Sequence, residues 1–106
     1  MGNEQPRRYK LNQELIDILG SSSVYYNPPE TIKLKYPCIV YNLNSLDTIK
    51  ANNNNYLYNT AYEITHIGRN PDDIIVKKIL EHFKYSRFDR EFIFENLYHR
   101  VFTIYY

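Results

Sequence analysis

The chain has 106 residues, the length of one domain, with 13 Lys and Arg against 12 Asp and Glu. This balance argues against a dedicated nucleic-acid-binding domain, because phosphate contacts need a basic surplus. A single cysteine, Cys38, excludes an internal disulfide and a zinc site built from cysteines. The sequence has no apolar run long enough for a membrane span and no signal peptide, so we expect synthesis in the cytoplasm and no membrane contact.

The first part of the chain predicts one helix and two strands. Residues 1–8 are polar and are expected to be flexible. Gly20 occupies the position that ends a helix, and residues 24–26 predict a short strand. Residues 36–41 predict a buried strand in which Cys38 is a small core residue rather than a nucleophile. The helix is indicated by apolar residues at the spacing of one helix face: Leu11, Leu15, Ile18 and Leu19.

Residues 42–55 are polar and centre on four consecutive asparagines, which favour turns and disfavour a core strand. We expect an exposed loop or the tip of a long hairpin. Because loops carry binding surfaces more often than scaffolds do, the segment from Ala51 is a candidate contact surface. Its candidate residues are Asn52, Asn53, Asn54, Asn55 and Tyr56.

The middle of the chain predicts a strand followed by a helix. Residues 56–67 alternate, and His66 falls on the apolar face, where an imidazole at the edge of the core is the ordinary expectation. Asn70 is expected to cap the next helix, with Asp72 and Asp73 near the positive end of its dipole. The apolar face of that helix is predicted as Ile75, Val76, Ile79, Leu80 and Phe83.

Residues 86–106 hold the densest aromatics and predict an antiparallel hairpin that turns at Glu95-Asn96. We expect the last strand to be paired, because chain ends otherwise fray. Because side chains alternate between the two faces of a strand, one face of the first strand is predicted to carry Phe88, Arg90, Phe92 and Phe94. One face of the second strand is predicted to carry Tyr98, Arg100, Phe102, Ile104 and Tyr106. The order of the predicted helices and strands along the chain indicates an α+β fold: a mostly antiparallel sheet with two helices on one face and a C-terminal β-hairpin.

The sequence gives weak support for enzymatic chemistry. Ser86, Asp89 and His99 are the residue types of a catalytic triad, but no glycine elbow accompanies them. His66 and His82, taken with His99, lack the spacing of a metal motif. We therefore predict no catalytic residues, no cofactor and no metal. A small hydrolase using Asp89 and His99, or a nucleic-acid-binding module, is a less favoured alternative.

The hairpin arginines allow two interpretations. Arg87, Arg90 and Arg100 alternate with carboxylates and aromatics. They can form cross-strand ion pairs, each of small energy. They can also belong to an arginine, carboxylate and tyrosine surface that contacts a neighbouring subunit. The twelve tyrosines of the chain suit an interface, since tyrosine buries apolar area and keeps a hydroxyl at the rim.

Three segments carry a resemblance to a known family: VYYNPPETIKLKYPCIVY, ANNNNYLYNTAYEITHIGRNPDD and SRFDREFIFENLYHRVFTIYY. Over residues 24–106 the chain resembles the tail terminators of tailed bacteriophages, encoded in the head–tail joining region of phages of low-GC Gram-positive hosts. It departs from that pattern at residues 51–53, where relatives tend to have Ala-Asp-Asn. Gly68 stands where they favour an acid, and His66 replaces an apolar residue.

The resemblance implies a structural protein of the virion, made in the host cytoplasm, that forms a homo-oligomeric ring, typically a hexamer. The ring would cap the tail tube protein and meet a head-completion or neck connector protein, with DNA passing through its lumen unbound. The alternative is another neck component, such as a head-completion or stopper protein. Candidate lumen acids are Glu63, Asp72, Asp73, Asp89, Glu91 and Glu95. Beside residues 51–56, the predicted subunit or partner interface consists of Tyr85, Arg87, Phe88, Asp89, Arg90, Tyr98, His99 and Arg100.

Overall fold

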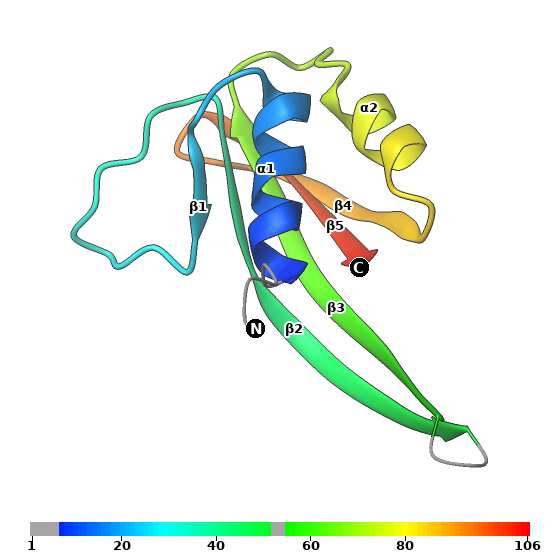
Figure 1. The fold of residues 1–106 in the computed structure, drawn as a ribbon. Helices are drawn as coiled ribbons and strands as arrows, with labels where there is room; N and C mark the ends of the chain where they lie inside the picture. Colours follow the sequence, from blue (N-terminus) through cyan, green and yellow to red (C-terminus); the bar gives the residue numbers. More distant parts are fainter. Residues whose placement is uncertain (1–6, 52–54) are drawn as a thin grey trace.

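The computed structural model describes residues 7–51 and 55–106, with side chains described outside residues 45–59. In chain order the elements are α1 (Arg7–Leu19), β1 (Val24–Tyr26), β2 (Cys38–Ala51), β3 (Asn55–Gly68), α2 (Ile75–His82), β4 (Ser86–Phe94) and β5 (Leu97–Tyr105). The strands form one sheet of order β1-β2-β3-β5-β4, in which only the β1–β2 pair of the described strands is parallel (Figure 1). The predicted α+β fold with a C-terminal β-hairpin is confirmed.

The first helix forms as its apolar spacing predicts. Gly20 ends it with φ of 85°, a left-handed conformation that costs glycine little, and its N–H donates to the carbonyl of Ile16 at 2.8 Å. Because α1 begins at Arg7, the expectation that residues 7–8 are flexible is wrong, while residues 1–6 lie outside the described part of the chain. The buried face of α1 consists of Leu11, Leu15 and Ile18.

Strands β2 and β3 continue beyond the rest of the sheet as a two-stranded arm. They pair as far as Ala51 opposite Asn55, whereas β5 reaches β3 only as far as Ala61. The chain is therefore 51 Å along its longest axis and 28 Å along the next (Figure 1). The loop expected at residues 42–55 is wrong, and its alternative, a long hairpin, forms. Polar side chains exclude burial of this segment but do not prevent strand pairing. Hydrogen bonds between the two strands satisfy the backbone N–H and C=O groups whatever the side chains are.

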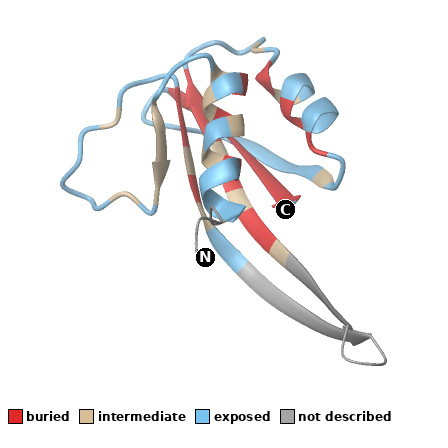
Figure 2. Cartoon of the chain, in the orientation of Figure 1, coloured by how far each residue is buried: buried red, intermediate tan, exposed pale blue. Residues whose placement is uncertain are grey.

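Both helices pack on the same face of the sheet, which we call the helix-covered face. Figure 2 shows that buried residues concentrate in the upper parts of β2 and β3 and in β5, whereas β4 is exposed along most of its length. A smaller cluster of Cys38, Ile67 and Leu97 packs on the opposite face. The core on the helix-covered face consists of Leu11, Leu15, Ile18, Ile39, Tyr41, Tyr62, Ile64, Ile75, Ile79, Phe83, Phe102 and Ile104.

The second helix begins later than the sequence suggests. The side chain of Asn70 accepts the N–H of Asp72 at 2.9 Å and so closes a turn. The carboxylate of Asp73 accepts the N–H of Ile75 at 3.0 Å, and the residue at the N-cap, Ile74, makes no side-chain cap. The prediction that Asn70 caps this helix is wrong, since a short polar side chain satisfies a local turn equally well.

Candidate subunit interface

Strand β4 forms an edge of the sheet and is exposed for eight of its nine residues. An edge strand offers unpaired backbone groups to any other strand, and proteins usually protect such an edge with charges. Here charged residues are interspersed with large apolar ones, so the edge is only partly protected against pairing. The exposed fractions of the apolar side chains are 41% for Phe88, 41% for Phe92, 62% for Ile93 and 58% for Phe94.

A β-bulge in β4 changes which side chains share a face. Phe88 opposes Phe102, but Arg90 opposes the neighbouring residue Val101. Phe88 therefore lies on the helix-covered face, with its ring 5.4 Å from that of Phe102, while Arg90 and Phe92 lie on the opposite face. The prediction of a single face for Arg90 and the aromatics of this strand is wrong, because a bulge inserts one residue and reverses the alternation beyond it.

On the opposite face, the bulge residue Asp89 is held by two donors. Arg87 Nε donates to Oδ1 at 2.7 Å, and Thr103 Oγ1 donates to Oδ2 at 2.6 Å. Partial burial by itself raises the pKa of Asp89, but the hydrogen bonds from Thr103 and Arg87 outweigh it, so the pKa lies below its usual value. Both carboxylate oxygens of this candidate residue are thus occupied within the chain, as the ion-pair interpretation expects.

Near the hairpin turn, aromatic rings gather around His99. The ring of Phe92 stacks on it with centroids 4.9 Å apart, and the ring of Phe94 meets it edge-on at 6.1 Å. Nδ1 of His99 lies 3.1 Å from the carbonyl of Leu97. These rings form an apolar patch on the opposite face that continues to the exposed edge.

Arg100 lies inside the protein rather than at its surface. Its side chain is 1% exposed, and Nε donates to Glu91 Oε2 at 2.9 Å. One terminal nitrogen donates to the carbonyl of Asn70 at 2.5 Å, and the other lies 3.3 Å from Nδ1 of His66. Arg100 opposes Glu91, which directly follows Arg90 in β4, so the two arginines lie on different faces. The expectation that Arg100 shares an exposed aromatic surface with Arg90 is wrong.

His66 is buried beside this arginine, at the place in the core that its alternation predicts. Burial, opposed by Asp73 and assisted by Arg100, lowers the pKa of His66 to about 4. The imidazole is therefore neutral at pH 7. Nδ1 accepts from Arg100, which assigns the proton to Nε2, 3.7 Å from Asp73. At neutral pH the contact with Asp73 is consequently not an ion pair.

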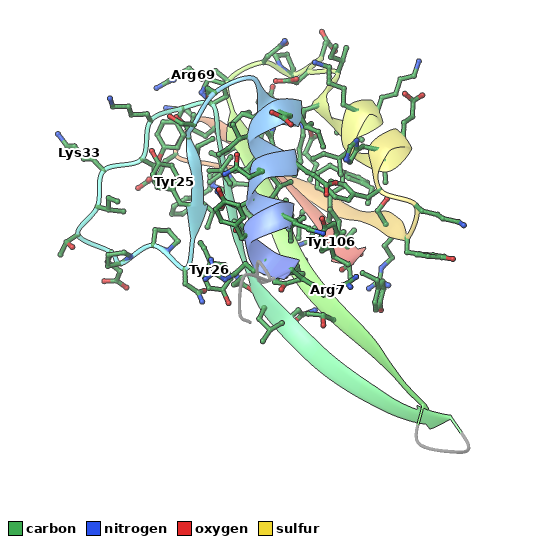
Figure 3. All side chains as sticks on the ribbon, in the orientation of Figure 1. Arg7, Tyr25, Tyr26, Lys33, Arg69 and Tyr106 are labelled. Carbon is green, nitrogen blue, oxygen red and sulfur yellow. The ribbon has the colours of Figure 1, made fainter. Side chains whose placement is uncertain are left out.

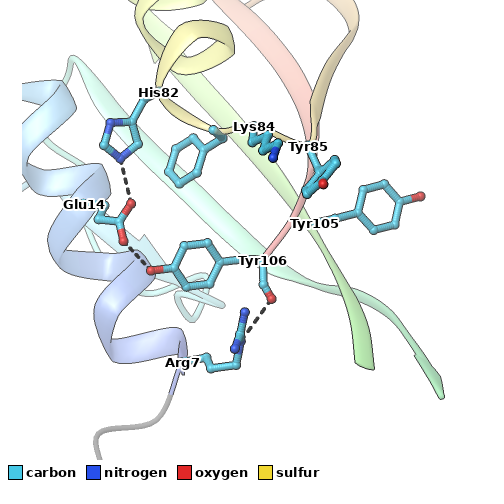
Figure 4. Close-up of a pocket in the computed structure, with 8 residues that line it drawn as sticks. Arg7, Glu14, His82, Lys84, Tyr85, Tyr105 and Tyr106 are labelled. Atoms are coloured by element: carbon cyan, nitrogen blue, oxygen red, sulfur yellow. Dashed lines mark hydrogen bonds and ion pairs between the residues drawn. The ribbon is translucent and has the colours of Figure 1, made fainter. Parts of the chain in front are cut away.

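A hollow of about 350 Å³ lies where α1, the end of α2 and the end of β5 meet (Figure 4). Oε1 of Glu14 is 2.7 Å from Nε2 of His82, and Oε2 of Glu14 accepts the hydroxyl of Tyr106. Burial and this hydrogen bond raise the pKa of Tyr106 to about 12, so its hydroxyl remains a donor at neutral pH. Arg7 donates to the Tyr106 carbonyl at 3.1 Å, and Figure 3 shows these two residues near each other at the start of α1.

The triad candidates lie apart in the fold. Ser86 donates to the carbonyl of Phe83 and opposes a core residue, so it faces the helices, whereas Asp89 and His99 lie on the opposite face. Among the described residues, no three His, Cys, Asp or Glu side chains gather as a metal site would require. Burial raises the pKa of Cys38 to about 11, so its thiol is protonated at neutral pH.

The remaining candidate residues lie at three places. Tyr85 precedes β4 and is 63% exposed. Tyr98 is half-buried, with the guanidinium of Arg100 5.3 Å from its ring centroid. The backbone of Asn55 and Tyr56 begins β3, but their side chains are not among those described. Outside the described part of the chain altogether lie Asn52, Asn53 and Asn54.

No family model, curated protein sequence or solved structure matches the chain significantly. Neither helix in the described ranges is long and apolar enough to cross a membrane. The hollow around Glu14 is a feature that the sequence did not predict. It joins residues as far apart as Arg7 and Tyr106, which are separated by 99 positions, and no local pattern signals such a contact.

Proposed function

We propose that this chain is a structural virion protein, a tail terminator that forms a hexameric ring. The ring caps the tail tube and joins it to a head-completion or neck connector protein, and DNA passes through its lumen without specific binding. Two lines of support meet in this proposal. One is the sequence resemblance over residues 24–106, and the other is a sheet edge that a second chain can complete.

The observation that carries the proposal is the edge strand β4. It combines a free backbone edge with four exposed large apolar side chains. Such an edge promotes uncontrolled pairing unless something covers it. In a ring, each copy covers the edge of its neighbour, and the closed assembly leaves no copy with an uncovered edge.

The β2–β3 arm supplies a second, different edge. In the described part of the chain, β1 pairs with β2 only as far as Tyr41, and β5 pairs with β3 only as far as Ala61. Beyond these points no other described strand pairs with the outer edges of the arm, so these edges can accept a strand of another chain. A contact between the arm of one copy and β4 of the next joins two unlike surfaces, and such a heterologous contact closes a ring when it is repeated by rotation.

The mass of the purified protein in solution tests this function. Light scattering after size exclusion, at two protein concentrations, should find a closed species near six times the 12.8 kDa of one chain. If only the monomer is found, the protein is mixed with isolated tail tubes, on which a ring can also close. Binding to tube ends supports the proposal, and a monomer that also fails to bind tubes contradicts it.

Another neck component, a head-completion or stopper protein, is distinguished by where the protein is found during assembly. A tail terminator co-purifies with assembled tails that lack heads, because it completes the tail before the head arrives. A stopper remains with the head and is absent from such tails. Finding the protein only on heads would replace the proposed function with this alternative.

A further inference from the structure

The β4–β5 hairpin has two ends of different chemistry. Ser86 opposes Ile104 at one end and Phe94 opposes Leu97 at the other. Figure 1 shows the β4–β5 turn and the C-terminus at opposite ends of this hairpin. Because β4 has nine residues, the two ends lie about 30 Å apart. A side chain at the turn therefore cannot reach the other end within one copy.

The end near the C-terminus is cationic and aromatic. Arg7 lies over the ring of Tyr106 and Lys84 over the ring of Tyr85, each 5.5 Å from the ring centroid. Figure 4 shows these two cations on either side of the hollow, whose carboxylate, Glu14, already has both oxygens occupied. Neither cation pairs with a carboxylate among the described residues. Arg7 is already bound to the main-chain oxygen of Tyr106, so Lys84 is the cation of this hollow that a carboxylate from another copy can reach.

The turn at the other end is acidic and apolar. Glu95 has φ of 52°, is exposed, and forms no ion pair with a described residue. The two residues before it, Ile93 and Phe94, are among the most exposed large apolar side chains of the described chain. The turn therefore presents one negative charge beside apolar surface, which complements the hollow in both respects.

We propose that the β4–β5 turn of one copy docks into the hollow at the other end of the hairpin in the next copy, where Glu95 meets Lys84. The proposal rests on the proposed ring and names the contact that gives the ring its direction. The turn and the hollow are different surfaces, so the same contact, repeated by rotation from copy to copy, can build a ring.

The surroundings of the hollow favour such a contact. A second hollow of about 300 Å³ shares Lys84, Tyr85 and Tyr105 with the first, so apolar side chains of the docked turn have aromatic surface on both sides. Tyrosine rings pack against apolar side chains and keep a hydroxyl for the rim. Each cation is already held over a ring, which reduces the side-chain entropy lost when the carboxylate binds.

Charge reversal with mixing tests the contact. Glu95→Lys alone places two like charges in the contact, and so does Lys84→Glu alone. Each variant should need at least about tenfold more protein to assemble, since like charges at an interface cost several kcal/mol. Mixed in equal amounts, the two variants restore attraction at every contact of an alternating ring, and assembly should return to the wild-type concentration. Assembly of each variant alone at the wild-type concentration, or no recovery on mixing, would overturn the contact.

Matched controls separate this contact from a general effect of charge. Lys77→Glu changes the same charge on the outer side of α2, away from both hollows, and should assemble as the wild type does. Glu95→Gln removes the charge without reversing it and should weaken assembly less than Glu95→Lys. Circular dichroism spectra that match the wild type establish that each variant is folded.

A carbodiimide cross-link decides the contact independently of the ring. This reagent joins a carboxylate to an amine only when they touch, and Glu95 and Lys84 of one copy are too far apart to react. An isopeptide bond between these two residues, found by mass spectrometry in concentrated protein or on tail tubes, therefore supports contact between copies. A hexamer without this bond overturns the contact and leaves the ring standing. Absence of both the bond and any assembly contradicts the contact and the proposed function together.

Discussion

Strands β3 and β4 have similar sequence patterns and opposite environments. Both alternate aromatic or β-branched residues with polar ones. From Ala61 to Ile67, β3 lies between β2 and β5, and every residue there is buried or half-buried. By contrast, β4 has a neighbour on one side only among the described strands and is exposed for all but its first residue. Alternation therefore predicts that a strand forms but not how many neighbours it has.

The difference between these strands also separates stability from assembly. Side chains in the sheet interior stabilise the fold of the single chain, because their burial is complete without a partner. Apolar side chains on β4 gain burial only when a second chain arrives. Substitutions in the interior should therefore change unfolding, and substitutions on β4 should mainly change association. Four predictions test this separation, from the largest effect on stability to the smallest.

The largest effect is expected for a fully buried residue of β5. Phe102→Ala should lower the free energy of unfolding by about 3–5 kcal/mol, because it removes a buried ring and leaves a cavity. Its partner across the hairpin, Phe88, is exposed, so Phe88→Ala should cost less than about 1.5 kcal/mol. Denaturant unfolding of monomeric protein measures both. Equal losses at the two positions would remove the proposed distinction between interior and edge.

The next effect is a dependence on pH that arises from His66. Its pKa is about 4 in the folded chain and about 6.5 when unfolded, so the unfolded state takes up the proton first as pH falls. The stabilisation is fully present above pH 6.5 and is lost progressively down to pH 4, by about 3 kcal/mol in total.

The His66→Gln variant keeps an acceptor for Arg100 and removes this titration. Unfolding measured between pH 7 and pH 4 should therefore show a shallower loss for this variant than for the wild type. Parallel pH profiles for the two proteins would show that His66 is not buried and neutral as described.

A somewhat smaller loss is expected when the buried arginine is replaced. Arg100→Met leaves Glu91, His66 and the carbonyl of Asn70 without their donor, which should cost about 2–3 kcal/mol. Arg90→Met is the matched control, since Arg90 is exposed and should change stability by less than about 0.5 kcal/mol. Thermal or denaturant unfolding of the two variants gives the comparison, and a larger loss at Arg90 would contradict it.

The smallest effect on stability is expected at the exposed edge. Phe92→Ser removes a ring that stacks on His99 but remains partly in solvent, so the monomer should lose about 1 kcal/mol or less. Association should weaken at least about tenfold, because the same ring is covered in the assembly. Light scattering over a dilution series reports the association. Unchanged assembly would exclude this part of β4 from the interface.

Local patterns predicted much of the fold. Helix α1 and its end at Gly20 followed from spacing and a glycine, and the hairpin turned at Glu95-Asn96 as expected because both strands alternate clearly. The sequence does not distinguish the β2–β3 arm from a loop, since its polar composition is compatible with either structure. The β-bulge after Phe88 has no composition signal, and it moved one aromatic residue to the other face.

The candidate site was less predictable than the fold. Arginine is rarely buried, so sequence reasoning placed Arg100 at the surface, whereas three partners on separate segments hold it inside. The hollow near Tyr106 depends on the packing of α1 against the end of the chain. Contacts of this kind follow from the tertiary arrangement, which single-sequence patterns do not encode.

Hydrogen exchange of the β4 amides is the most direct test of the central claim, that another copy of the chain completes this edge. In an antiparallel pair, alternate N–H groups of β4 point away from β5. These groups should exchange rapidly in dilute monomer and become protected in the assembled species, while amides of β3 from Ala61 to Ile67 stay protected in both. Rapid exchange of the outward β4 amides in a fully assembled ring would contradict the account.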